Sequence, residues 1–487
     1  MRFNVFSSPS LDVPSLQTQY LQDVPFPRPL LTIFSTVIQQ GCKTVIEEND
    51  YVDADFLSEY ESFYAKAFNV IPKYCKRLHF FNIEIKQANL LDLNEEKYKK
   101  AYLGFCVLRP TNVGKVGRTI LHPPQSGNDM FFLCKVMFQS HIMGAKFEIA
   151  GMPFTQQDTS VGACAHACIW MTSLYMHRKH LLPKFLPFQL TEFATRSLSF
   201  GSVMPNRKGI QIIQMLEALR LAGMQCITSE FGAISDPSKN TIRKRFIYPY
   251  LESELPVILI FQFLSGPGHA VVALGHTFER NLTPEILSTV NNKQFLSNIS
   301  WVPTFLINND NSGPYMELPS VSTDPYDYSL DKVVSAIALL PPEVTNFAEE
   351  VESNVIHMMS KWEKGLETKD LVFRTYLLSS NHFLADLASN KTNMPIELKK
   401  QYRIISMPKY IWITEISTVE YINKPNAQDR KIIGEFITDS TANPYDEQKI
   451  FLAMRFKKDL VIYNFENNKL EGSELPDDSI YTGLVRN

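Results

Sequence analysis

QQDTSVGACAHACIWM, residues 156–171, joins a polar loop to a run of small and large apolar side chains. The apolar run covers 163–176 and is followed by four basic residues at 177–180, which suit the C-terminal end of a helix. The pattern therefore predicts a helix over 163–176 with Cys164 in its first turn. Free N–H groups at a helix start favour the thiolate, the nucleophilic form of cysteine, so Cys164 is a candidate nucleophile.

Two later segments offer the partners that a catalytic thiolate needs. GPGHAVVALGH (residues 266–276) places His269 at the start of an apolar, strand-like run, and FLINNDNSGPY (305–315) ends the next strand with Asn309 and Asp310. Because side chains at the ends of neighbouring strands can meet, we expect Asp310 or Asn309 to accept a hydrogen bond from the imidazole of His269. Taken alone, Asp310 also fits a turn, which Asn, Asp and Gly favour.

The order of these residues resembles that of the papain-like cysteine peptidase superfamily, especially the bacterial branch that includes the double-glycine leader peptidases. GIQIIQMLEALRLAG (209–223) and LPVILIF (255–261) match the second helix and the strand before the histidine, so the resemblance covers about residues 150–320. It implies a helical lobe and an antiparallel β-sheet lobe with a cleft between them. It also implies Cys164 as nucleophile, His269 as general base and then acid, and Asp310 as the orienting group. Gln157 would donate to the oxyanion together with the backbone N–H of Cys164.

We expect an enzyme, a thiol hydrolase acting as a peptidase or isopeptidase on a protein or peptide through a Cys-His-Asp/Asn triad. An acyltransferase would use the same triad with an amine or thiol as acceptor. A catalytically inactive scaffold that serves as a binding module is a third hypothesis, because Gln157 lies seven positions before Cys164 and an insertion occupies about 279–300.

Other cysteines and histidines near Cys164 have simpler explanations. Cys168 lies one turn later inside the predicted helix, where it would pack as a small hydrophobic residue. A zinc site built from Cys164, His166, Cys168, His177 and His180 lacks a second Cys/His pair at a usual spacing. We therefore expect neither a metal nor a cofactor.

Two further motifs are interpreted as surface turns. RPTNVGKVGRT brings together Arg109, Lys115 and Arg118 without the spacing of a P-loop, so we expect a solvated turn. A basic loop beside a cleft that holds a substrate carboxylate is the alternative. Glu435 and Asp439, in GEFITDSTANPYD, have no histidine partner and are interpreted as surface and turn residues.

The chain has 487 residues, which at ~150 residues per domain predicts about two to four domains. We expect an α+β protein with an N-terminal arm at 1–35, an α+β region at 36–150, the papain-like domain at 151–330 and a C-terminal α+β region at 331–487. The flanking regions would build cleft walls or recruit a partner protein. The predicted helices are 49–67, 163–176, 210–222, 344–362 and 371–387. The predicted strands are 78–85, 102–108, 131–138, 145–149, 256–263, 270–275, 304–308, 410–416, 431–438, 450–455 and 460–465.

Charge and hydropathy exclude several classes of protein. The 48 basic and 51 acidic side chains give a net charge of -3, which provides no electrostatic reason to expect nucleic acid. The apolar stretch at 255–264 is too short to span a membrane, and the start of the chain lacks the features of a signal peptide. Seven cysteines, an odd number in a long chain, indicate reduced thiols. We therefore expect a soluble cytoplasmic protein.

Overall fold

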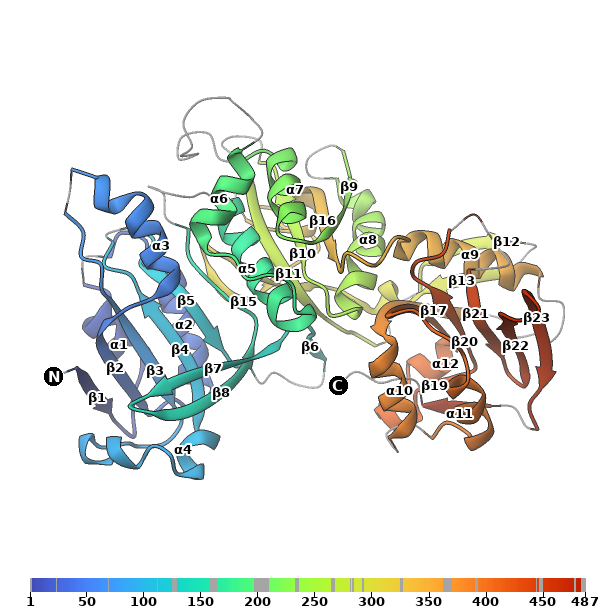
Figure 1. Cartoon of the computed structure of the whole chain (residues 1–487), viewed down its shortest axis with the longest axis horizontal. Helices are drawn as coiled ribbons and strands as arrows, with labels where there is room; N and C mark the ends of the chain where they lie inside the picture. Colours follow the sequence, from blue (N-terminus) through green and yellow to red (C-terminus); the bar gives the residue numbers. More distant parts are fainter. Residues whose placement is uncertain are drawn as a thin grey trace. The chain divides into compact units, whose positions relative to one another are not determined.

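The computed structural model divides the chain into two compact units, each built from three segments (Figure 1). Unit 1 comprises Met1–Asp236, Pro256–Gly275 and Phe305–Leu339, and unit 2 comprises Pro237–Leu255, His276–Thr304 and Leu340–Asn487. Both units mix helices and sheets, which confirms the predicted α+β class at that level. The domain boundaries expected from the sequence stay predictions. The structure describes all residues except 1, 23, 69, 112, 125–128, 158–163, 197–209, 233–235, 264–267, 281, 283, 291–292, 325–326, 362–369, 390–392, 444, 446–449, 477–478 and 483–487.

The N-terminal part of unit 1 is a five-stranded antiparallel sheet whose strand order follows the chain. Its strands are β1 (Phe3–Ser7), β2 (Thr44–Tyr51), β3 (Cys75–Phe81), β4 (Tyr102–Leu108) and β5 (Val116–Leu121). Its helices are α1 (Val13–Tyr20), α2 (Arg28–Gln39), α3 (Ala54–Ser62) and α4 (Glu96–Lys100). The helix predicted over 49–67 is shorter than expected, because β2 runs to Tyr51 and Asp53 then caps α3 by accepting from two backbone N–H groups.

The first 35 residues are not an arm, contrary to the prediction. They form β1, α1 and the start of α2, and the apolar side chains of α2 are buried at Leu30, Ile33, Phe34 and Val37. Two of the five prolines in this stretch, Pro14 and Pro29, lie in the first turns of the two helices, where a missing N–H costs nothing.

The second sheet of unit 1 carries the candidate site. Its order is β15-β14-β11-β10-β16-β9, and β6 pairs with β11 off this path. The strands are β6 (Met130–Phe132), β9 (Gln225–Glu230), β10 (Val257–Phe261), β11 (His269–Thr277), β14 (Phe305–Asn309), β15 (Gly313–Leu318) and β16 (Val333–Leu340). The helices beside it are α5 (Cys164–His180), α6 (Pro187–Thr195) and α7 (Ile212–Leu221). From Ala167 to Met176 every residue of α5 is buried, which explains why its sequence shows no polar face.

A two-stranded ribbon completes unit 1 and corrects one predicted strand. β7 (Val136–Ile142) pairs with β8 (Ala145–Gly151), so the strand expected over 131–138 is divided between β6 and β7. Met143 and Gly144, at the tip, both have positive φ angles, as a two-residue hairpin of this kind requires.

Unit 2 contains a long sheet in the order β12-β13-β17-β18-β20-β21-β22-β23 and a small sheet of β19 and β24. The strands are β12 (Ile286–Val290), β13 (Lys293–Ser297), β17 (Leu371–Ser379), β18 (Tyr410–Thr418), β19 (Lys431–Ile432), β20 (Gly434–Asp439), β21 (Phe451–Phe456), β22 (Asp459–Asn464), β23 (Lys469–Glu474) and β24 (Tyr481–Thr482). The helices are α8 (Asn240–Glu252), α9 (Ala348–Lys361), α10 (Ser380–Ala388), α11 (Ile396–Arg403) and α12 (Val419–Ile422). The prediction of a helix over 371–387 was wrong for its first half, because this part of the chain forms β17.

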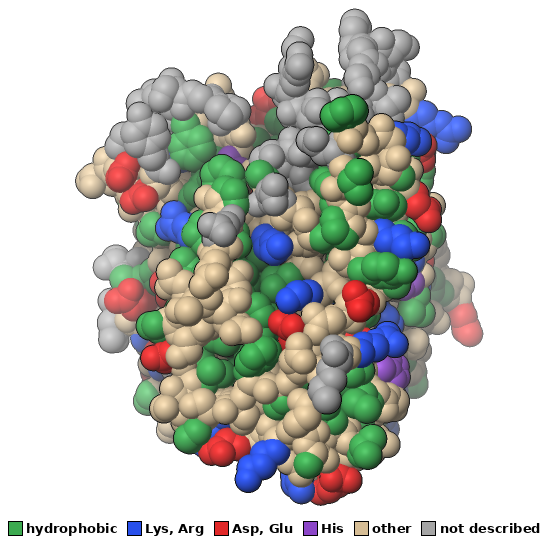
Figure 2. Space-filling view, turned by 90° about the vertical axis from the view of Figure 1, so that its left-hand side faces the viewer, with side chains coloured by type: hydrophobic (Ala, Val, Ile, Leu, Met, Phe, Trp, Pro, Cys, Tyr) green, Lys and Arg blue, Asp and Glu red, His purple; other side chains and the backbone are tan. Residues whose placement is uncertain are grey.

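Surface charge and helix hydropathy agree with the composition. On the face of the molecule shown in Figure 2, basic and acidic side chains are interspersed. Within the described part of the chain, every helix is too short or too polar to cross a bilayer.

Candidate active site

Cys164 and Cys168 occupy different environments on the same helix. Cys164 is the first residue of α5 and is half-buried, whereas Cys168 lies one turn later and is fully buried. Burial raises the pKa of the Cys168 thiol well above its ordinary value, and the negative charge of Asp310 acts in the same direction. Cys168 is therefore a packing residue, as predicted, and Cys164 is the more accessible of the two thiols.

His269 lies against the turn that follows β14. It is the first residue of β11, and β14 is the neighbouring strand in the sheet. Its Nε2 lies 3.0 Å from the side-chain oxygen of Asn309 and 3.4 Å from a carboxylate oxygen of Asp310. The structure thus brings both predicted orienting residues to one nitrogen of the ring, with Asn309 the closer.

The hydrogen bonds of Asn309 define which nitrogen of His269 carries the proton. The side-chain oxygen of Asn309 also accepts from the backbone N–H of Asn311 at 3.1 Å, so this oxygen is an acceptor on both sides. Nε2 of His269 must then be the donor, because an amide oxygen cannot donate. In the neutral ring this leaves Nδ1 with a lone pair that can accept a proton from a thiol.

Two opposing influences set the charge of His269. Burial by itself would lower its pKa, but a hydrogen bond with Cys164 and the negative charge of Asp310 raise it to about 9. Burial raises the pKa of Asp310 to about 6, although the positive charge of His269 and backbone N–H groups oppose the increase. Between these two values His269 is positively charged and Asp310 is negatively charged.

Gln157 is joined to the same turn from the other side. Its side-chain Nε2 donates to the side-chain oxygen of Asn311 at 2.8 Å, and the Nδ2 of Asn311 lies 3.5 Å from Nδ1 of His269. Residues 158–163, which connect Gln157 to Cys164, lie outside the described residues.

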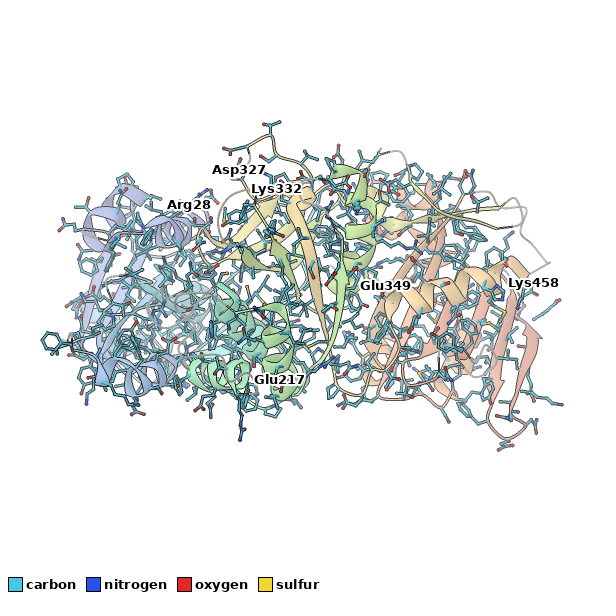
Figure 3. The ribbon with its side chains drawn as sticks, turned by 90° about the horizontal axis from the view of Figure 1, so that it is seen from above. Arg28, Glu217, Asp327, Lys332, Glu349 and Lys458 are labelled. Atoms are coloured by element: carbon cyan, nitrogen blue, oxygen red, sulfur yellow. The ribbon has the colours of Figure 1, made fainter. Side chains whose placement is uncertain are left out.

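Asn311 and Tyr328 are two site residues that the sequence analysis missed. The rings of Tyr328 and His269 are 5.1 Å apart at an angle of 45°. Burial raises the pKa of Tyr328, and hydrogen bonding with Asn311 and Asn309 counteracts the increase. Lys332 holds the Tyr328 loop by donating to the backbone oxygen of Asp327 at 2.8 Å, and Figure 3 shows the two residues side by side. The motif NNDNSG was the one sequence signal for Asn311, and Tyr328 had none.

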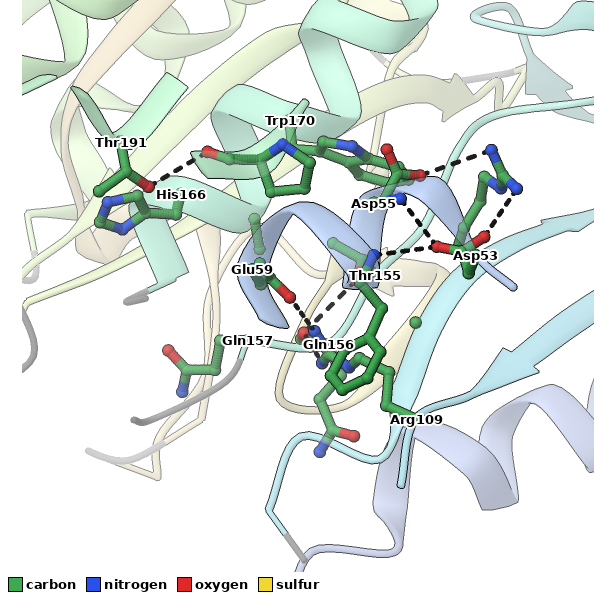
Figure 4. Close-up of a pocket in the computed structure, with 15 residues that line it drawn as sticks. Asp53, Asp55, Glu59, Arg109, Thr155, Gln156, Gln157, His166, Trp170 and Thr191 are labelled. Carbon is green, nitrogen blue, oxygen red and sulfur yellow. Dashed lines mark hydrogen bonds and ion pairs between the residues drawn. The ribbon is translucent and has the colours of Figure 1, made fainter. Parts of the chain in front are cut away.

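A cavity of about 40 Å³ beside α5 is lined by both arginines that were expected in a solvated turn (Figure 4). Arg109 is buried and donates to the backbone oxygens of Gly114 and Gln156 at 2.7 and 2.6 Å. Arg118 lies 2.7 Å from Asp53. The prediction of a solvated turn was therefore wrong for both arginines, which are held inside the protein by carbonyl and carboxylate oxygens.

Acidic and basic side chains form ion pairs around this cavity. Arg118 lies 3.5 Å from Asp55, and Arg109 lies 3.6 Å from Glu59. Burial raises the pKa of Asp55 to about 6, while the positive charges of Arg118 and Lys184 oppose the increase. These pairs tie α3 to β5 and to the segment that leads to Gln157, a structural role that needs no ligand.

Glu435 also differs from its prediction as a surface residue. It lies on β20 with 3% of its surface exposed, and its carboxylate accepts from the Nε of Arg455 at 2.7 Å and from Tyr402. Asp439, at the end of β20, accepts from the backbone N–H of Thr441 at 2.7 Å, as a turn residue does.

Among the described residues, no group of three or more His, Cys, Asp or Glu side chains has a metal-binding arrangement. His177, which belonged to the zinc alternative, lies with Nδ1 2.6 Å from the backbone oxygen of Leu182.

The chain matches no model of a known protein family and no curated protein. Among solved structures it is similar to the peptidase domain of Streptococcus ComA, a bifunctional ABC transporter involved in a quorum-sensing pathway. The sequences are 15% identical, the match covers 38% of this chain and 95% of that domain, and the TM-score is 0.23. A function for this chain therefore has to be inferred from the residues of its own site.

Proposed function

We propose that this protein is a papain-like thiol hydrolase that cleaves an amide bond in a protein or peptide, with Cys164 as nucleophile and His269 as general base and acid. The observation that carries the proposal is the position of His269, whose Nε2 lies beside Asn309 and Asp310 and whose pKa is raised by its interaction with Cys164. A nucleophile, a base and a group that orients the base are the three parts of this kind of catalysis.

The first half of the reaction forms a thioester. Nδ1 of His269 takes the thiol proton, and the pKa of about 9 keeps that proton on the ring at neutral pH. The sulfur of Cys164 then attacks the carbonyl carbon. When the tetrahedral intermediate collapses, the C–N bond breaks and His269 returns the proton to the leaving amine.

The second half releases the acid. A water molecule gives one proton to His269 and attacks the thioester carbon. The C–S bond breaks, and the proton on His269 restores the thiol of Cys164. Throughout, Asn309 accepts from Nε2 and fixes the plane of the ring, while Asp310 stabilises its positive charge.

The developing oxyanion needs donors close to Cys164. The backbone N–H of Cys164, at the start of α5, is one, and the side chain of Gln157 is the other. One of its two amide hydrogens bonds to Asn311. The second hydrogen is the one that would reach the oxyanion.

The test uses p-nitrophenyl acetate, a small activated ester that acylates reactive thiols. We expect a burst of nitrophenolate in the wild-type protein, with the acetyl group found on Cys164 by mass spectrometry. The burst should be lost in Cys164→Ala and His269→Ala and kept in Cys168→Ala, the matched control from the same helix. A folded wild-type protein that shows no burst, or a burst that persists in Cys164→Ala, would overturn the proposal and favour a non-catalytic scaffold.

A further inference from the structure

Thr32 of helix α2 bonds directly to the turn that carries the orienting residues, although 280 positions separate it from its partner. Its hydroxyl donates to the backbone oxygen of Ser312 at 2.6 Å. The other possible acceptor for this hydroxyl, the backbone oxygen of Arg28 in the same helix, is farther away at 3.1 Å. Ser312 is buried, and its N–H donates to the backbone oxygen of Asn309 at 2.9 Å. Thr32 is therefore two hydrogen bonds away from Asn309.

The contact between α2 and this turn leaves no spare room. Gly313 follows Ser312 with a φ of +130°, a conformation that side chains disfavour. A Cβ atom built on Gly313 would lie 2.4 Å from the Cβ of Thr32, well inside van der Waals contact. The turn is consequently fixed by a hydrogen bond and by close packing against α2.

The residues before α2 also hold the segment that leads to Gln157, on the other side of the site. The side chain of Gln156 donates to the backbone oxygen of Phe26 at 3.3 Å and accepts from the backbone N–H of Val116 at 3.2 Å. Gln157, the next residue, bonds to Asn311 of the turn. Phe26 and Thr32 thus contact two segments that meet at Asn311.

We propose that Thr32 is a positioning residue of the catalytic centre, which makes the N-terminal segment part of the active site. This inference rests on the proposed function. By holding the backbone of Ser312, Thr32 sets the distance from Asn309 and Asp310 to Nε2 of His269. Loss of the hydroxyl would let the turn move away, which would weaken the hydrogen bond and the charge interaction that keep His269 protonated.

The experiment compares the full-length protein with Thr32→Val, which removes the hydroxyl at nearly constant volume. The matched controls are Thr32→Ser, which keeps the hydroxyl, and Thr36→Val in the same helix. Thr36 donates only within the helix, to the backbone oxygen of Thr32 at 2.9 Å. Two quantities are measured: the rate at which iodoacetamide alkylates Cys164 at pH 7, by mass spectrometry, and the pKa of His269, by NMR of protein carrying ¹⁵N-labelled histidine.

We expect Thr32→Val to slow alkylation about fivefold, the factor that corresponds to one neutral hydrogen bond, and to lower the pKa of His269. Thr32→Ser and Thr36→Val should behave like the wild type. A purely structural role would lower the unfolding temperature without changing the pKa of His269, and this result would overturn the inference. If Thr32→Val does not fold, Thr32→Ala removes the same hydroxyl with less bulk and gives the same comparison.

The two proposals fail in different ways. A wild-type Cys164 that reacts no faster than a free cysteine thiol overturns the proposed function, and the positioning role of Thr32 falls with it. A reactive wild-type Cys164 with an unchanged Thr32→Val variant overturns the positioning role alone.

Discussion

Replacing Asp310 by asparagine is expected to lower the pKa of His269 substantially. The substitution keeps the shape of the side chain and removes its charge, which lies 3.4 Å from Nε2. At an effective dielectric constant of about 20, two unit charges at this separation interact by at most about 5 kcal/mol, or roughly 3 to 4 pH units. This ceiling exceeds the whole increase in the pKa of His269, from 6.5 to about 9. Cys164 contributes part of that increase, so we expect a decrease of about 1 to 2 pH units.

The assay is an NMR titration of ¹⁵N-labelled histidine, in which the signal that disappears in His269→Gln identifies His269. Asn309→Ala is the control, because it removes a hydrogen bond to the same nitrogen and leaves the charge of Asp310. Its effect should stay below about 1 pH unit, since one hydrogen bond contributes about 1 kcal/mol. If Asp310→Asn leaves the pKa unchanged, or if Asn309→Ala lowers it more, the ion pair between His269 and Asp310 does not control the charge of the ring.

Two further predictions concern stability. The pKa of His269 is about 9 in the folded protein and 6.5 ordinarily. Protonation of its ring therefore contributes about 3 kcal/mol to the free energy of unfolding. This contribution is complete below pH 6.5 and is lost as the pH rises through 9. Urea unfolding at pH 6 and pH 10 should show this loss in the wild type and not in His269→Gln; equal losses would contradict it. Gly313→Ala should lower the free energy of unfolding by at least about 2 kcal/mol, because it combines a positive φ with a clash against Thr32. Gly144→Ala, with a positive φ and open space, should cost about 1 kcal/mol; equal costs would show that the packing against α2 is loose.

Local sequence patterns identified α5, α7, β10, β11 and β14 around the site and missed α6, β9, β15 and β16. They also failed where two elements join without a break. β10, β11 and β14 are apolar runs bounded by turn residues, and the structure places strands at all three. The segment after Leu371 has apolar residues on both sides of Ser379, so it resembles one long helix. In the structure Ser379 ends β17 and caps α10 by accepting from the N–H of His382.

Parts of the site were accessible from sequence because they lie at the ends of regular elements. His269 begins a strand and Asn309 ends one, so a chemical motif coincides with a structural boundary at both positions, and Cys164 is the first described residue of α5. Thr32 and Tyr328 carry no such signal. They reach the site through contacts between segments that are remote in the sequence, and no local pattern encodes a contact of that kind.

The discontinuous construction of unit 1 has a consequence for synthesis on the ribosome. β9 is translated before β10 but joins the sheet through β16, which ends at Leu340. A nascent chain that has already exposed Cys164 therefore still lacks β16, the strand that joins β9 to β10 in the sheet. Any reactivity of that cysteine that depends on the finished sheet would emerge late in translation, when more than two-thirds of the polypeptide has been made.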